Sequence, residues 1–130
     1  SAKYFHAYLG GLIEVVNPDA EDFIVASGCA VSQAREAVRQ EGEAGRKVGL
    51  VKIKTIRPFP TEDIYEALKG AKRILVPEFN QAGWLHKELC SVLYGRTKGV
   101  IKDGPRVYGG MTMPTEMILE TLAEFRKEVK

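Results

Sequence analysis

The sequence predicts an α/β fold of three layers, in which a mostly parallel sheet of four to five strands lies between two layers of helices. Short apolar runs rich in β-branched residues alternate along the chain with longer segments whose apolar residues recur every three or four positions. These patterns are typical of buried strands and amphipathic helices, respectively. The segments that join them are short and contain glycine or proline. Strands that alternate with helices in this way form parallel sheets covered by helices on both faces.

Residues 1–16 leave two interpretations open. One is a helix with a single apolar face, because aromatic and aliphatic residues recur at helical spacing in Tyr4, Tyr8, Leu12 and Val16. The other is a break at Gly10-Gly11 followed by a short strand over residues 12–16, since each glycine in a helix interior costs about 1 kcal/mol relative to alanine. Either way the sequence assigns this segment no role. Asn17-Pro18-Asp19 ends it with a turn.

The next part of the chain predicts a strand, a turn, a helix and a second strand. Residues 22–28 form an apolar run that ends in glycine, which predicts a buried strand and a tight turn. Residues 30–44 predict a helix whose inward side carries Val31, Ala34, Ala37 and Val38, and Gly45 ends it. Residues 48–56 are rich in β-branched side chains and predict the second strand.

The second half continues the alternation. Thr61 is a candidate N-cap, and the acidic residues that follow it complement the helix dipole. Ile118, Leu122, Phe125 and Val129 are spaced as the inward side of a last helix. The predicted elements are a helix over residues 61–70, a strand over 73–77, a helix over 83–94, a loop over 96–105, a short strand over 106–108 and a helix from about residue 115.

Composition excludes several classes of protein. Nineteen Lys and Arg against 17 Asp and Glu leave a net charge of +2, too small for a nucleic-acid binder. No apolar run predicts a membrane span or a signal peptide. The two cysteines lie far apart in a chain with two histidines, which excludes a zinc site of the usual kind. We therefore expect one cytoplasmic domain over residues 1–130, with no metal and no contact with nucleic acid or membrane.

The first candidate site lies where the strand over residues 22–28 ends. Ligands of open α/β sheets bind beyond the carboxyl ends of the strands. Backbone N–H groups of Ser27, Gly28 and Cys29, at the start of a helix, can hold an anion and lower the pKa of the thiol. In the alternative, which the sequence favours, the glycine serves the turn and the small cysteine fills a crowded corner. Neither a GxGxxG nor a GxxxxGK[ST] motif is present.

The second candidate follows from alternation along the strand over residues 48–56. Lys52 and Lys54 share one face with Leu50, whereas Val51 and Ile53 point the other way. Two lysines under a covering helix would be unfavourable, so this face is expected to meet solvent or a partner. Together with Arg57 at the strand exit, the two lysines are candidates for a docking surface. A merely solvated face is the alternative.

The third candidate is Glu78, at the end of the strand over residues 73–77. A carboxylate there can act as a general base, cap the following helix or pair with an arginine. Because no His, Ser or Cys lies within sequence reach to complete a catalytic set, no catalytic residue is predicted. His6 and His86 stand alone, and a metal site or a catalytic triad needs several convergent groups.

Three motifs in order resemble one family. They are Arg57-Pro58-Phe59-Pro60 after the second strand, Glu78-Phe79-Asn80-Gln81-Ala82-Gly83 after the third, and Gly109-Gly110 followed by Pro114-Thr115-Glu116 before the last helix. From about Asp22 onward the chain resembles the transketolase C-terminal-like domain, or domain II, of 2-oxoacid:ferredoxin oxidoreductase alpha subunits of the pyruvate synthase type. Two positions depart from the family pattern: Trp84 stands where glutamine is common, and Pro77 precedes the glutamate.

The resemblance implies an enzyme that oxidatively decarboxylates pyruvate or a related 2-oxoacid to acyl-CoA. Such enzymes use thiamine diphosphate with Mg, [4Fe-4S] clusters, coenzyme A and ferredoxin. This chain has no thiamine-diphosphate motif and too few cysteines for a cluster, which needs four thiolates. It is therefore expected to be a non-catalytic structural or docking domain, a fragment of a longer alpha subunit, with other domains or subunits of the same oxidoreductase as partners.

Two other functions stay open at this point. One is the equivalent domain of a transketolase or of a dehydrogenase E1 beta component, against which the first two motifs argue. The other is a free-standing flavodoxin-like module that binds an anion at Ser27, Gly28 and Cys29. Fold alone cannot separate them, because sheets of this kind host many functions.

Overall fold

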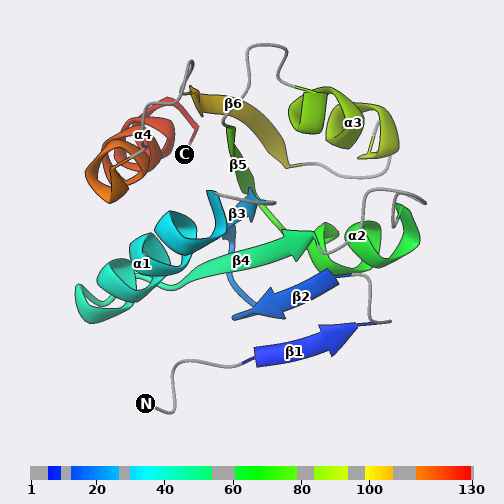
Figure 1. Cartoon of the computed structure of the whole chain (residues 1–130), viewed down its shortest axis with the longest axis horizontal. Coiled ribbons are helices and arrows are strands. Elements are labelled where there is room, and N and C mark those ends of the chain that lie inside the picture. Colours follow the sequence, from blue (N-terminus) through cyan, green and yellow to red (C-terminus); the bar gives the residue numbers. More distant parts are fainter. Residues whose placement is uncertain are drawn as a thin grey trace.

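The computed structural model describes residues 6–9, 13–26, 30–53, 61–78, 84–93, 99–106 and 114–129. These residues form six strands and four helices (Figure 1). The strands are β1 (His6–Leu9), β2 (Ile13–Val16), β3 (Asp22–Ala26), β4 (Val48–Ile53), β5 (Arg73–Glu78) and β6 (Val100–Arg106). The helices are α1 (Ala30–Glu43), α2 (Thr61–Leu68), α3 (Trp84–Leu93) and α4 (Thr115–Glu128).

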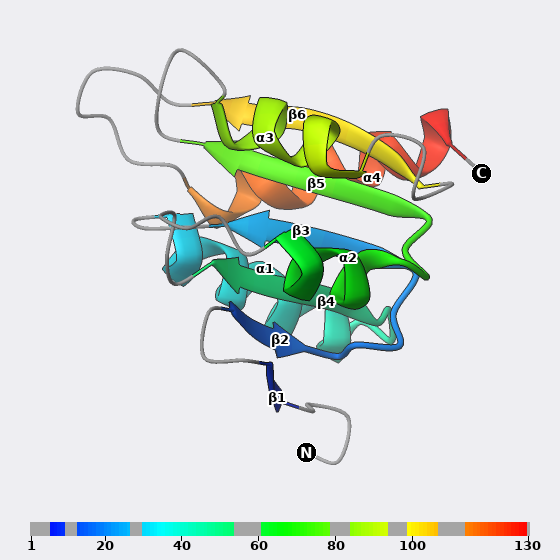
Figure 2. The ribbon, with the colours of Figure 1, turned by 90° about the vertical axis from the view of Figure 1, so that its right-hand side faces the viewer.

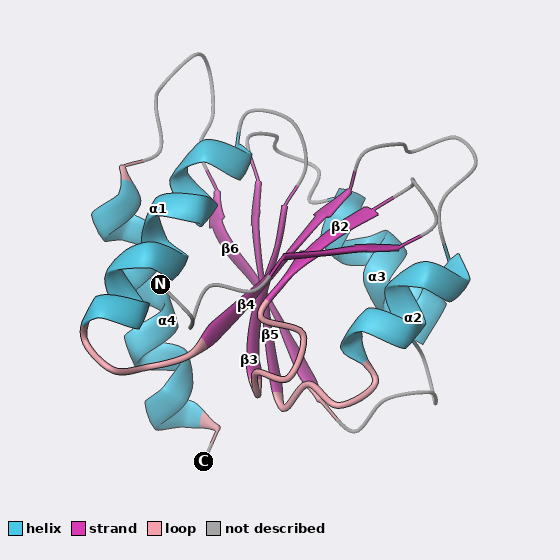
Figure 3. Ribbon diagram, turned by 90° about the horizontal axis from the view of Figure 1, so that it is seen from below, coloured by secondary structure: helices cyan, strands magenta, loops and turns pink. Residues whose placement is uncertain are grey.

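All the described strands join one sheet in the order β1-β2-β4-β3-β5-β6. The four strands from β4 to β6 in this order run parallel, whereas β2 is antiparallel to both β4 and β1. Helices α1 and α4 cover one face of the sheet, and α2 and α3 cover the other (Figures 2 and 3). The predicted three-layer α/β/α fold is confirmed, and the sheet has one strand more than the four to five expected.

The additional strand comes from the N-terminal segment, where the interpretation as a continuous helix was wrong. β1 and β2 form an antiparallel hairpin, and β2 pairs with β4. Ile13 and Val15 lie on one face of the sheet and Val16 on the other, all of them buried. The alternative of a short strand before Asn17 is therefore confirmed. The physical reason is that a β-branched strand buried on both faces stabilises the chain more than an isolated amphipathic turn does.

The loop predicted over residues 96–105 was also wrong in part. Residues 100–105 belong to β6, which begins six positions before the predicted short strand and ends at Arg106. The polar stretch Lys102-Asp103-Gly104 shows no strand pattern in the sequence. It is held in the sheet by parallel pairing with β5, a tertiary contact that local propensity does not register.

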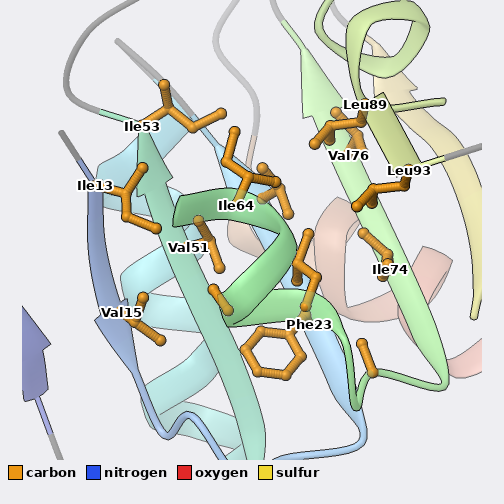
Figure 4. Close-up of a cluster of buried hydrophobic side chains, with 14 of the residues drawn as sticks. Ile13, Val15, Phe23, Val51, Ile53, Ile64, Ile74, Val76, Leu89 and Leu93 are labelled. Carbon is orange, nitrogen blue, oxygen red and sulfur yellow. The ribbon is translucent and has the colours of Figure 1, made fainter. Parts of the chain in front are cut away.

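Two separate cores lie on the two faces of the sheet. Figure 4 shows the core beneath α2 and α3, to which β3 contributes Phe23 and β4 contributes Val51. The core beneath α1 and α4 takes the alternate residues of the same strands, Ile24 and Leu50. The inward residues predicted for the two long helices, from Val31 to Val38 and from Ile118 to Phe125, are buried in this second core.

A glycine in β4 makes room for the largest side chain in the first core. Gly49 is the register partner of Phe23 in the neighbouring parallel strand. A Cβ atom at position 49 would lie 2.4 Å from Cε1 of the Phe23 ring, far inside van der Waals contact. The ring therefore occupies the space that the missing side chain leaves open.

Ion pairs at the amino ends of the parallel strands attach α4 to the sheet. The amino-edge network consists of Asp22, Glu41, Arg73 and Arg126. Arg126 Nε donates to Asp22 at 2.7 Å, and its Nη1 donates to Glu41 at 2.5 Å. Arg73 also donates to Asp22, and its Nε donates to the Val129 carbonyl at 2.6 Å. The network thus joins β3, β5, α1 and α4.

Glu41 is the most useful reporter of this network. Burial raises the pKa of its carboxyl, but hydrogen bonds from Arg46 and Arg126 more than offset this, so that the pKa lies below the ordinary 4.5. A carboxyl whose pKa is lower in the folded than in the unfolded chain stabilises the fold above the ordinary pKa. That contribution is lost as the pH falls through the lower, folded-state value.

We predict that Gly49→Ala lowers the free energy of unfolding by about 1–3 kcal/mol, the usual effect of an overpacked core. The added methyl group forces Phe23 or the β3–β4 pairing to move. Urea denaturation followed by circular dichroism measures the loss. Gly42→Ala is the control, because a Cβ at that exposed position in α1 meets nothing within 4 Å and alanine favours the helix by up to about 1 kcal/mol. Equal stability of the two variants would contradict the packing argument.

We predict that Glu41→Gln destabilises the chain at pH 7 by about 1–3 kcal/mol, because hydrogen bonds to charged groups are lost. The same change reduces the fall in stability below pH 4.5, since the titrating carboxyl is gone. Urea denaturation at several pH values between 3 and 7 measures both effects. Glu43→Gln, at an exposed position on the same helix, is the control. Parallel pH profiles for the wild type and Glu41→Gln would show that the network does not respond to pH in this way.

Candidate functional site

The carboxyl edge of the sheet gathers the segments that the sequence singled out. The four parallel strands end there at Ala26, Ile53, Glu78 and Arg106. Residues 27–29 follow β3, 54–60 follow β4, 79–83 follow β5 and 107–113 follow β6. All the predicted site segments therefore begin at the carboxyl edge of the sheet, although they are spread over more than half of the sequence.

Most of the predicted site residues lie outside the described residues. These are Ser27, Gly28, Cys29, Lys54, Arg57, Pro58, Phe59, Pro60, Asn80, Gly83, Gly109 and Gly110. The backbone of Glu78 is described as the last residue of β5. The predicted opening of the last helix is confirmed, because Pro114 precedes α4, which begins at Thr115 and has Glu116 in its first turn.

The order in which successive strands are added reverses between β3 and β5. The chain leaves β3 toward α1 on one face, and it leaves β5 toward α3 on the other (Figures 2 and 3). Such a switch point at the carboxyl edge is where open α/β sheets bind their ligands. Residues 27–29 and 79–83 follow the two strands that flank it. The topology thus favours these two segments over the others as a ligand site.

Lys52 has a less open environment than its sequence pattern predicted. The alternation itself is confirmed, because Val51 and Ile53 lie in the core beneath α2 and α3, and Leu50 lies in the core beneath α1 and α4. Lys52 is half-buried. Its register partner in β2 is Glu14, whose carboxylate accepts a hydrogen bond from Arg35 of α1 at 2.9 Å. Lys52 can therefore interact with the Glu14 carboxylate within the sheet as well as with a docking partner.

The register also places two separately predicted sites side by side. Lys52 is the partner of Ala26 in the parallel β3–β4 ladder, and Ala26 immediately precedes Ser27. The docking candidate and the anion-site candidate thus belong to neighbouring positions at the same strand ends. Their separation of about 25 positions in the sequence hid this proximity.

The amino edge carries the charged groups that sequence reasoning missed. An open cleft of about 320 Å³ lies there, lined by Asp19, Ala20, Glu21, Asp22, Arg46, Lys47 and Arg126. Its cations contact carboxylates: Lys47 contacts Asp19 at 2.8 Å and Arg46 contacts Glu41 at 3.1 Å, while Arg126 belongs to the amino-edge network. One signal in the sequence was available, because Glu41 falls on the inward side of the helix and a buried carboxylate needs a cation.

Other reactive groups of the described part offer no catalytic set. Cys90 lies exposed on α3, and partial burial of its thiol raises its pKa, which makes it a weaker nucleophile at neutral pH. Within the described ranges, no group of three or more His, Cys, Asp or Glu residues is arranged to hold a metal ion. None of the helices seen there is long and apolar enough to span a bilayer.

Comparison with known proteins finds the family. The family described as pyruvate:ferredoxin oxidoreductase core domain II matches residues 20–117. Pyruvate synthase subunit PorA of Methanosarcina barkeri is 32% identical over 135 residues, which cover 98% of this chain and 34% of the relative. The alpha subunit of NADH-dependent phenylglyoxylate dehydrogenase of Aromatoleum evansii is 39% identical over 83 residues, which cover 64% of this chain and 19% of the relative.

Solved structures agree with this assignment. A 2-oxoglutarate:ferredoxin oxidoreductase from Magnetococcus marinus, with 2-oxoglutarate, coenzyme A and succinyl-CoA bound, superposes with a TM-score of 0.68 and 27% identity, over 86% of this chain and 19% of that one. A split-gene transketolase, an inactive beta4 tetramer, has a TM-score of 0.71 at 16% identity, over 85% of this chain and 40% of that one. The second likeness shows the fold alone.

The resemblance predicted from the three motifs is thereby confirmed, and it extends over most of the chain. The chain spans about a third of the length of the Methanosarcina PorA subunit. Its fold agrees with that of the 2-oxoglutarate:ferredoxin oxidoreductase over 86% of the chain. The chain belongs to the pyruvate:ferredoxin oxidoreductase core domain II family, the transketolase-like second domain of 2-oxoacid:ferredoxin oxidoreductase alpha subunits.

Proposed function

We propose that this chain is a non-catalytic structural and docking domain of a thiamine-diphosphate-dependent 2-oxoacid:ferredoxin oxidoreductase. The enzyme would convert pyruvate or a related 2-oxoacid to acyl-CoA and pass the electrons to ferredoxin. The match of residues 20–117 to the family carries the proposal. The carboxyl edge supports it, because the family's motif segments all start there, beside the switch point of the sheet.

The chemistry of the reaction is assigned to cofactors bound elsewhere in the enzyme. Thiamine diphosphate with Mg, [4Fe-4S] clusters and coenzyme A are the cofactors that the proposal implies. The residues of this chain do not fit the first two groups: the sequence has no thiamine-diphosphate motif and two cysteines, whereas a cluster needs four thiolates. No step of the reaction is therefore assigned to this chain's side chains.

Other domains or subunits of the same oxidoreductase are the proposed partners, together with ferredoxin for the whole enzyme. The printed names of several relatives describe subunits of larger enzymes, which supports this. We place the enzyme in the cytoplasm. The transketolase alternative has less support, because its structural likeness is at 16% identity, against 27% for the 2-oxoglutarate enzyme. No contact in the described residues favours a free-standing anion-binding module.

Lys52, Lys54 and Arg57 are proposed as part of the docking surface. Lys52 lies one residue before the end of β4, half-buried and beside Ala26 of β3. This position is close to the carboxyl edge, from which the family's motif segments start. Long-range attraction between such a group and an acidic partner speeds association and weakens with salt.

The first test concerns cofactor binding. We predict that the 130-residue chain, titrated with thiamine diphosphate and Mg in a calorimeter, releases no heat beyond dilution. We also predict no turnover of pyruvate or 2-oxoglutarate when coenzyme A and ferredoxin are supplied, because the ligands for the phosphates and the metal are absent from its sequence. The complete enzyme containing this chain is the positive control. Micromolar binding of thiamine diphosphate by the chain alone would overturn the assignment of that site to other domains.

The second test concerns docking. We predict that Lys52→Gln, Lys54→Gln and Arg57→Gln, combined in the complete enzyme, slow its assembly at low salt, and that the difference from wild type disappears at high salt. Glutamine is preferred to glutamate at position 52, because a carboxylate beside Glu14 would add like-charge repulsion within the sheet.

The matched control for docking is Lys87→Gln, which removes one charge from the exposed surface of α3. Melting temperatures of the isolated variants separate loss of fold from loss of docking. If the triple variant keeps its fold and assembles at the wild-type rate at every salt concentration, the three cations form a solvated or internal set and the docking surface lies elsewhere.

A further inference from the structure

The N-terminal hairpin is a part of the fold to which neither the sequence motifs nor the family match gives a role. The match begins at residue 20, after β1 and β2. β2 is nevertheless an integral strand of the sheet, because Ile13, Val15 and Val16 are buried in the cores on its two faces. β1 pairs with β2 over all four of its residues. The hairpin therefore extends the packed sheet by two strands.

β1 forms one of the two edges of this sheet (Figures 1 and 2). Among the described strands, it has β2 as its neighbour on one side and no strand on the other. In an antiparallel strand, the N–H and C=O groups of alternate residues point to opposite sides. Half of these groups in β1 therefore face β2, and the other half face outward. Such a row of outward groups is a template for a further strand.

The opposite edge of the sheet has an irregular backbone. β6 pairs with β5 in regular parallel register as far as Val76, and the next pair is Glu78 with Arg106. Between these pairs, Pro77 of β5 faces residues 104 and 105 of β6. Gly104 takes up the extra residue with φ of +128°, a backbone conformation open to glycine. Because a bulge bends and twists its strand, β6 is a poor template for a further strand.

The composition of the two edge strands differs in the same direction. β6 contains Lys102, Asp103 and Pro105, and charged residues and proline are means by which proteins protect exposed sheet edges. β1 has the sequence His6-Ala7-Tyr8-Leu9, with no Lys, Arg, Asp, Glu or Pro, and its register with β2 is regular. Neither its composition nor its backbone opposes pairing with another strand.

We propose that β1 is a strand-addition site, at which an extended segment from another part of the same oxidoreductase pairs with its outward edge. The origin of this segment rests on the proposed function. In strand addition, main-chain hydrogen bonds supply the affinity. The segment has no proline at the positions that donate to β1, because proline cannot donate to a ladder.

The length of β1 favours this partner over a second copy of the chain. β1 has four residues, whereas a stable interface between separate proteins buries at least about 1,000 Å². Two copies joined through one such short ladder fall below that area. Within a larger enzyme, other contacts already hold the parts together, and a linked segment has a high effective concentration. This chain covers 34% of the Methanosarcina PorA subunit, and an enzyme of that size has further segments to supply.

Hydrogen–deuterium exchange of the β1 amides tests the proposal without a substitution. In the 130-residue chain, we expect the amides of alternate residues, either His6 and Tyr8 or Ala7 and Leu9, to exchange freely, whereas β2 protects the other two. In the complete enzyme, exchange of the free pair is expected to slow by about tenfold or more. Equal exchange of β1 in the chain and in the complete enzyme overturns the proposal.

Sedimentation of the 130-residue chain checks the alternative occupant. We expect a monomer at micromolar concentration. A dimer in which all four β1 amides are protected would identify a second copy as the partner and overturn the assignment to another part of the enzyme.

Two proline variants, Ala7→Pro and Tyr8→Pro, separate strand pairing from mere covering of β1. The exchange pattern identifies which of the two removes an outward N–H group and which removes a bond to β2. The outward variant is expected to keep the melting temperature of the chain, because edge strands tolerate proline there, and to weaken association in the complete enzyme by about fivefold, the equivalent of one hydrogen bond.

The other variant is the matched control, because it breaks the hairpin and lowers the melting temperature of the chain itself. Wild-type association of the outward variant, with its fold retained, overturns the proposal. None of these measurements depends on turnover of a 2-oxoacid, so a failure of the strand-addition site is distinguishable from a failure of the proposed function.

Discussion

The contact between the Phe23 ring and Gly49 sets the register on which both ends of the sheet depend. Because side chains alternate between faces, a slip of one residue between β3 and β4 would exchange the two cores. It would also move both ends of β3 relative to its neighbours. With Phe23 beside Gly49, Asp22 lies at the amino edge within reach of Arg73 and Arg126, and Ala26 lies beside Lys52 at the carboxyl edge. A single glycine thus aligns the ion pairs and the candidate site.

The amino edge of the sheet carries a set of ion pairs. At the amino edge, described cations of the cleft and the network pair with nearby carboxylates. Breaking a buried pair is strongly unfavourable, so the pairs that Arg126 forms with Asp22 and Glu41 hold α4 against the sheet and α1. At the carboxyl edge, the motif segments follow the ends of the parallel strands.

One departure from the family pattern has a structural reason. Pro77, which precedes the motif glutamate, lies opposite the bulge in β6, where Pro105 likewise offers no N–H group and Gly104 accepts the extra residue. The irregular ladder is a consequence of these three residues together. The other departure, Trp84, is the first residue of α3, and nothing in the structure explains its difference from the usual glutamine.

The sequence by itself determined the elements and the family. The helices over residues 30–43 and 115–128, the strands that begin at Asp22, Val48 and Arg73, and the three motifs were all readable, because periodicity and capping act over a few neighbouring residues. Only the tertiary structure decided the hairpin of β1 and β2, the strand β6, the surroundings of Lys52, the register of Glu78 and the amino-edge network. Their partners are remote: Arg126 binds Asp22 across 104 positions. No local pattern records such a partner, since folding alone brings the two charges together.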